Sequence, residues 1–162
     1  MNLTFLHLTL VHIPILFVPL GLCFFLLSLR NHNRTLKSTG LGLFILSGVF
    51  VVPAFLLGEE AEDGVKPIAA VDKHDIEEHE AAADFALWWT IALGVLALGQ
   101  VAVDKYKPEK SKKLTIPLII FGLFSTATLS KTAWEGGKIR HPEAHEKAPK
   151  SSISSQPILR NL

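Results

Sequence analysis

Four long apolar blocks, separated by polar intervals, dominate the hydrophobic pattern of this chain. The first occupies residues 3–29, and three more occupy residues 39–57, 81–103 and 114–134. Each block is long enough to cross a bilayer, for which about 20 apolar residues suffice. In lipid, a chain that does not close into a barrel satisfies its backbone hydrogen bonds only as helices. The pattern therefore predicts an all-α fold, an antiparallel bundle of four transmembrane helices.

The polar intervals determine which residues meet on one side of such a bundle. With four crossings, the start of block 3–29, the end of 39–57, the start of 81–103 and the end of 114–134 share one side. Residues 58–84 are rich in Asp and Glu, and we expect them to contain a polar helical loop between the second and third spans. Residues 1–145 then form the four-helix transmembrane domain. Residues 146–162, rich in Ser, Pro and Lys, are expected to be a flexible tail.

The distribution of charge predicts an orientation, although the net charge of +1 does not. The two short intervals on the opposite side contain eight basic residues, and by the positive-inside rule these are cytoplasmic. The acidic side and both termini then face outward. No basic patch interleaved with aromatics indicates nucleic-acid binding, and a single cysteine, Cys23, excludes an intrachain disulfide. The eight residues are Arg30, Arg34, Lys37, Lys105, Lys107, Lys110, Lys112 and Lys113.

Histidines from separate stretches are expected to join the acids on the outer side. His7 and His12 lie five residues apart, which on a regular helix is a rotation of roughly 140°, so we expect separate roles for them. Asp75 precedes His79 by one helical turn, and a carboxylate so placed can fix the tautomer of a ligating imidazole. His141 follows Gly136 and Gly137, which we expect to end the last helix so that the chain turns back over the bundle mouth.

Four short motifs resemble a known family. They are HLTLVHIP near the start, GEEAED after the second block, an acid-rich HE pair before the third and GGKIRH after the fourth. The four motifs are similar to those of bacterial membrane proteins grouped as domain of unknown function 2231. The resemblance covers about residues 5–145, with Leu8 and Ile13 departing from the family pattern. It places the chain in a bacterial inner membrane and matches the imidazoles His7, His12, His79 and His141. Fusions of such proteins to Rieske or cytochrome c modules imply electron transfer with a redox partner protein.

A b-type haem is the first hypothesis for the cofactor. Imidazoles from facing helices, small residues around them and a polar rim are what bis-His haem ligation in a bundle requires. We expect His12, His79 and His141 to be the ligands, with His7 as a fourth if two haems bind.

A non-haem metal site is the second hypothesis. Mixed imidazole and carboxylate ligands suit zinc, copper or iron. A di-iron centre is disfavoured, because such bundles use Glu-x-x-His pairs and position 76, three residues before His79, is Ile. The ligands expected are His12, His79, His141, Glu60, Glu62 and Glu80.

A bundle without cofactor, acting as a membrane assembly subunit, is the third hypothesis. The acids would then form a solvated surface on the outer side of the lipid bilayer. No nucleophile elbow, phosphate loop or dinucleotide fingerprint is present, so a hydrolase or kinase function has no support. The sequence leaves open whether the protein is an enzyme of another kind.

Overall fold

The computed structural model describes residues 3–65 and 73–140, and the side chains of these residues except 61–65 and 140. Within those ranges the chain is helical, with no strand, which confirms the predicted all-α fold of four long apolar helices. The elements are α1 (Leu3–Asn31), α2 (Arg34–Val65), α3 (Lys73–Tyr106), the 3-10 helix η1 (Pro108–Leu114) and α4 (Thr115–Arg140).

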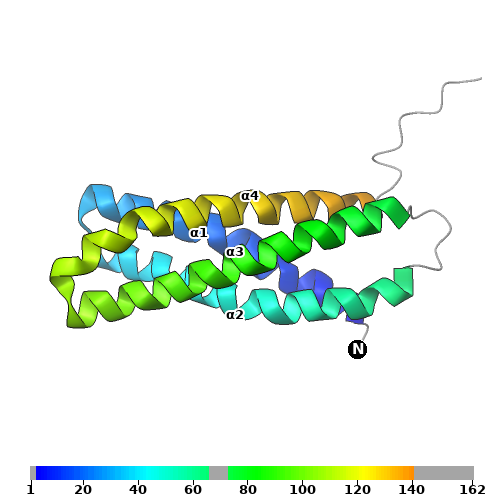
Figure 1. Ribbon diagram of the computed structural model, residues 1–162, viewed down its shortest axis with the longest axis horizontal. Helices are drawn as coiled ribbons and strands as arrows, with labels where there is room; N and C mark the ends of the chain where they lie inside the picture. Colours follow the sequence, from blue (N-terminus) through cyan, green and yellow to red (C-terminus); the bar gives the residue numbers. More distant parts are fainter. Residues whose placement is uncertain (1–2, 66–72, 141–162) are drawn as a thin grey trace, which may run out of the picture.

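The four helices lie side by side, and each runs opposite to the one before it (Figure 1). Contacts join α1 to α2, α2 to α3, α3 to α4 and α4 back to α1. The starts of α1 and α3 and the ends of α2 and α4 therefore lie together, and we call this the histidine end because it carries His7 and His79. The turn between α1 and α2 and the connection through η1 form the other end, which we call the basic end.

The turn between α1 and α2 is tight, and its sequence explains why. His32 has a φ of 50°, a left-handed conformation that ends α1. The Asn33 side-chain oxygen then accepts hydrogen bonds from the backbone N–H groups of Thr35 and Leu36, at 2.9 and 3.1 Å. This is the preferred N-cap chemistry, because it satisfies donors that have no partner inside the helix.

The helices are longer than the apolar blocks that predicted them. α2 continues through Gly58 to Val65, and α3 begins at Lys73, eight residues before the predicted apolar span. The acidic interval is therefore helical on both sides of residues 66–72, which lie outside the described part, as does the expected tail. At 34 residues, α3 is about 50 Å long, more than the roughly 30 Å of a bilayer's hydrocarbon core. The helix is therefore longer than a perpendicular crossing of that core requires.

The prediction that Gly136 and Gly137 end the last helix is wrong. α4 runs through both glycines to Arg140, and no described glycine has a positive φ. The physical reason lies in packing: the α-carbon of Gly136 sits against the ring of His79, so the missing side chain allows a close approach and does not serve a turn. His141, which the turn was expected to carry over the bundle mouth, lies outside the described residues.

Glycines also set how closely the helices approach elsewhere. A Cβ on Gly40 of α2 would lie 2.8 Å from the carbonyl oxygen of Gly21 and 2.9 Å from the nitrogen of Phe25, both in α1. Gly48 of α2 and Gly94 of α3 meet in the same way, with a Cβ on either one 3.2 Å from the other's Cα. Small residues at helix crossings are the usual means of close packing where hydrophobic side chains face lipid.

The outer faces of the four helices are strongly apolar. All four are long and apolar enough to cross a membrane. A soluble bundle of this size would direct such side chains inward, whereas here large hydrophobic residues are more than half exposed on every helix. Examples are Phe5, Leu16, Val49, Leu56, Phe85, Trp88, Val95 and Ile116.

A polar network joins the helices at the basic end. The Lys37 ammonium of α2 lies 2.6 Å from an Asp104 carboxylate oxygen of α3 and donates to the Ser111 hydroxyl of η1 at 3.0 Å. The buried Gln100 amide donates to the same two partners, at 2.6 and 3.0 Å. This network ties α2 to α3 and η1 at the end opposite the histidines.

Candidate functional site

His7 is half-buried near the start of α1 and is held by the neighbouring helix. Its Nδ1 lies 2.8 Å from the carbonyl oxygen of Ala54 in α2. A carbonyl oxygen only accepts, so Nδ1 carries the proton and the lone pair is left on Nε2. Gly58, one turn beyond Ala54, makes room for the ring: a Cβ there would lie 2.9 Å from Cε1 of His7.

His79 is held in the same way in the second half of the chain. Its Nδ1 donates to the carbonyl oxygen of Thr132 in α4 at 3.0 Å. Gly136, again one turn further along, faces the ring, and a Cβ there would lie 3.1 Å from Cε1 of His79. The Nδ1 proton again leaves the lone pair on Nε2, the arrangement in which a second hydrogen bond orients a metal-ligating imidazole.

The two imidazoles line one partly open cavity at the histidine end. Its volume is about 50 Å³, enough for a metal ion or a few water molecules, since one water needs roughly 10–15 Å³. The other lining residues are mostly apolar and come from all four helices. They are Val11, Pro14, Ile15, Val51, Ala54, Phe55, Ala83, Ala86, Leu129 and Thr132.

A larger hollow, of about 170 Å³, lies between α3 and α4. It is lined by Ala81, Ala82, Phe85, Thr128 and Lys131. None of these side chains offers an imidazole or carboxylate ligand, and Phe85 is exposed on the outer surface. The smaller cavity between the imidazoles is therefore the candidate site.

An ion cluster joins α3 and α4 next to His79 in the chain. The Lys138 ammonium lies 2.6 Å from a carboxylate oxygen of Glu135 on its own helix and 3.3 Å from one of Glu78 on α3. Glu135 is only 6% exposed, so its charge needs this partner. Because Glu78 and His79 are neighbours in α3, and Glu135 and Gly136 are neighbours in α4, the cluster fixes the two helices beside the imidazole.

The expected orienting role of Asp75 falls to a different group. The partner of Nδ1 of His79 is the Thr132 carbonyl of α4, not a carboxylate on its own helix. The close approach of α4 at Gly136 brings its backbone within reach of the ring. His74, also on α3, forms an exposed pair with Glu78 at 3.5 Å and does not line the cavity.

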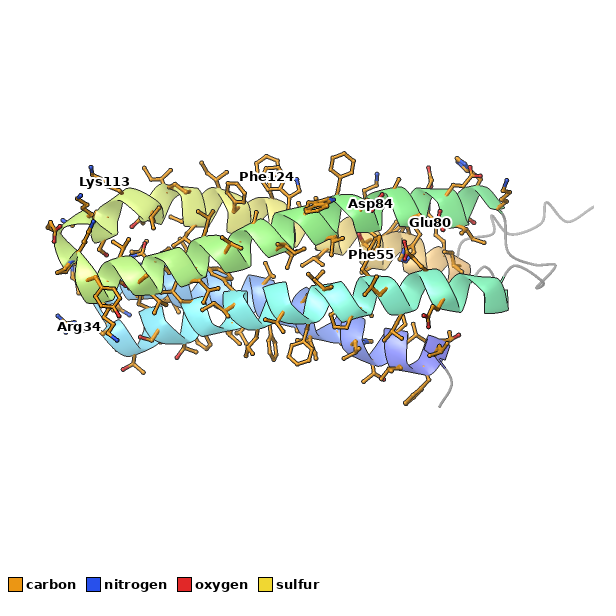
Figure 2. All side chains as sticks on the ribbon, turned by 60° about the horizontal axis from the view of Figure 1, so that its bottom comes forward. Arg34, Phe55, Glu80, Asp84, Lys113 and Phe124 are labelled. Carbon is orange, nitrogen blue, oxygen red and sulfur yellow. The ribbon has the colours of Figure 1, made fainter. Side chains whose placement is uncertain are left out.

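Several other residues expected at the site do not line the cavity. His12 is exposed on α1 and donates from Nδ1 to the carbonyl of Leu8 on its own helix, so it faces away from His7, as their spacing predicts. Glu60 and Glu80 are also exposed, and Figure 2 shows Glu80 and Asp84 on α3. The side chains of Glu62 and His141 lie outside the described part of the chain.

The sequence does not show which protein groups bind the two imidazoles. The anchors at Ala54 and Thr132 are backbone carbonyls, which every residue has and no side chain reveals. Gly58 and Gly136 each follow the residue with the accepting carbonyl by four positions. This spacing indicates the two glycines only once those carbonyls are known. Within the described ranges, no group of three or more His, Cys, Asp or Glu side chains is placed to hold a metal ion.

Comparison with known proteins adds no relative. No family model, curated protein or solved structure matches this chain.

Proposed function

We propose that this protein spans a membrane as an antiparallel four-helix bundle and binds one metal centre between His7 and His79, with b haem as the first candidate and electron transfer as its role. The observation that supports this most directly is the pair of imidazoles on one cavity, each with Nδ1 bonded to a carbonyl of an adjacent helix. That bond selects the tautomer with a ligating Nε2.

The number of ligands favours haem. Bis-His ligation needs two imidazoles, and the two that line the cavity supply them, whereas structural zinc requires four protein ligands and catalytic zinc three. Haem would contribute a one-electron couple, and this chain would contribute the axial imidazoles and an apolar surrounding. The expectation that His12 shares this site has no support, because His12 is exposed on the outer face of α1.

The size of the cavity sets a condition on haem binding. A porphyrin needs space on the order of the 300–1,000 Å³ typical of small-molecule sites, and the cavity has about 50 Å³. The donor set fits haem, while the space does not at the present helix separation. Haem binding therefore requires the helix ends to separate, and a single ion does not. A non-haem metal, copper in particular, which imidazole ligands suit, is the second candidate for this reason.

Purification of the full chain in detergent from haem-sufficient cells tests the proposal. An absorption spectrum with a Soret band and about one iron per chain supports haem. Stoichiometric copper, zinc or iron without porphyrin supports the second candidate. Purified protein that contains neither porphyrin nor stoichiometric metal would contradict the proposal and favour the cofactor-free assembly subunit.

We also propose that the basic end is cytoplasmic and the histidine end lies on the outer side of a bacterial inner membrane. The eight basic residues of the two short connections support this orientation. In a Cys23→Ser background, a cysteine replacing exposed Lys73 should react with a membrane-impermeant maleimide in intact cells that have a permeable outer membrane. One replacing exposed Lys110 should react only after lysis. The reverse labelling pattern would invert the orientation.

A further inference from the structure

The two halves of the bundle repeat each other around the candidate site. His7 and His79 differ by 72 positions, and each donates from Nδ1 to a carbonyl of the next helix. The two acceptors, Ala54 and Thr132, differ by 78 positions, and each is followed four residues later by the glycine that faces the imidazole ring. The α1–α2 hairpin and the α3–α4 hairpin thus present the same three parts in the same order: an imidazole, a carbonyl acceptor and a glycine.

The correspondence extends through the interior at the same two offsets. In α1 and α3, residues 72 positions apart that match in burial or in lining the cavity include Val11 with Ala83, Pro14 with Ala86, Val18 with Thr90, and Phe25 with Ala97. In α2 and α4, matching residues 78 positions apart include Ser47 with Ser125 and Val51 with Leu129. Side chains of different size thus occupy the same places, so the likeness is more one of position than of residue type.

The difference between the two offsets has a local cause. The second hairpin needs six more residues between its helices than the first. The first hairpin turns through His32 and Asn33, whereas the second connects through η1, Pro108–Leu114. The insertion therefore lies at the basic end, far along the helices from the imidazoles, and leaves the register within each helix pair unchanged.

We propose that the chain consists of two copies of one helical hairpin, and that the metal centre lies on the pseudo-two-fold axis between them and takes one equivalent imidazole from each. α1 and α3 run in the same direction (Figure 1), so this axis runs along the bundle, as in membrane proteins built from parallel repeats that bind at the repeat interface. The assignment of a ligand to this axis rests on the function proposed above. It selects a centre that two imidazoles can hold: two-coordinate copper(I) in the cavity of about 50 Å³ as it stands, or haem iron once the hairpins separate.

The anchoring bonds also suit a cofactor inserted between the hairpins. The His7–Ala54 and His79–Thr132 hydrogen bonds each run within one hairpin, as do the bonds of Lys138 to Glu78 and Glu135. Separation of the hairpins at the histidine end would therefore break none of them. Each imidazole would move with its own hairpin and keep its tautomer while the cavity widens.

Two matched glycine substitutions in the full chain test the repeat without any cofactor. In detergent-solubilised protein with ¹⁵N-labelled histidine, the ring nitrogen shifts should report an Nδ1 proton on both His7 and His79. Gly58→Ala should shift the His7 signals alone, and Gly136→Ala should shift the His79 signals alone. Gly137→Ala is the control, since a Cβ there meets nothing within 4 Å. Different tautomers for the two rings, or a substitution that disturbs both rings, would overturn the two-hairpin assignment.

Titration of the same proteins with hemin tests the ligand part. The repeat predicts that Gly58→Ala and Gly136→Ala weaken binding by similar factors, about 10–100-fold, as loss of a supporting contact to a metal ligand commonly does. It also predicts that His7→Ala and His79→Ala each abolish the low-spin spectrum. Low-spin binding retained in one His variant would overturn the shared axial site. If neither hemin nor copper(I) binds the wild type, the proposed function and the axial site both fail, whereas the NMR experiment still decides the repeat.

Discussion

Replacing Gly40 with alanine should weaken the bundle, whereas the same change at Gly42 should not. A Cβ at Gly40 would lie 2.8 Å from the Gly21 carbonyl oxygen and 2.9 Å from the Phe25 nitrogen, and both are backbone atoms of α1 that no side-chain rotation can move. A Cβ at Gly42 meets nothing within 4 Å. The two positions are two residues apart on the same helix, so they form a matched pair.

The expected difference in the free energy of unfolding follows from one contribution that the two substitutions share and one that they do not. Either Gly→Ala change gains helix propensity, about 1 kcal/mol, and this gain cancels in the comparison. Only Gly40→Ala must force α1 and α2 apart, and overpacking of this kind costs about 1–3 kcal/mol. The free energy of unfolding should therefore be about 1–3 kcal/mol lower for Gly40→Ala than for Gly42→Ala. Reversible unfolding in mixed detergent micelles, followed by circular dichroism, measures the difference.

Equal stability of these two variants would refute the reasoning. It would mean that α1 and α2 are not in backbone contact at Gly21 and Gly40, and the register of the first hairpin would then be in error. Because Ala54 and His7 belong to the same hairpin, such a result would also weaken the candidate site.

Two further predictions concern polar groups inside the bundle and at its basic end. Ser125→Ala should leave the free energy of unfolding unchanged or raise it by up to about 1 kcal/mol, because the fully buried Ser125 hydroxyl has no hydrogen-bond partner among the described residues. Ser47→Ala should lower it by about 1 kcal/mol, since its hydroxyl donates to the Leu43 carbonyl at 2.8 Å; the opposite ranking in the same unfolding assay would contradict this. Lys37→Met and Asp104→Leu should each destabilise the basic end, and their double variant should lose less than their sum by about 0.5–1 kcal/mol. Strict additivity of the two changes would show that the ion pair contributes nothing.

The fold was readable from the sequence because its signal is long and redundant. Four apolar blocks predict four helices whatever the details of any one residue. Two crossings separate His7 from His79, and this alone places both at the same end. The boundaries were not readable in the same way. The polar extension of α2 beyond Gly58 and of α3 before Ala81 adds helix outside the apolar blocks, where hydropathy carries no information.

The chain topology places His7 and His79 at one end of the bundle, but it does not say which histidines line the cavity there. Of the residues expected to bind a cofactor, His7 and His79 line the cavity, whereas His12 does not. Composition could not separate His7 from His12, because both are histidines in one apolar segment that forms a single helix. Only the rotation around that helix distinguishes them. The helix-ending role given to Gly136 failed because glycine serves close approach as well as turns, and the sequence does not say which.

The most direct test of the central claim compares three proteins purified identically from haem-sufficient cells: the wild type, His7→Ala/His79→Ala, and His12→Ala. Absorption spectra and metal analysis of the three are the measurement. We expect one haem, or failing that one metal ion, per chain in the wild type and in His12→Ala, and none in the double variant. Cofactor retained by the double variant, or absent from all three, would contradict it.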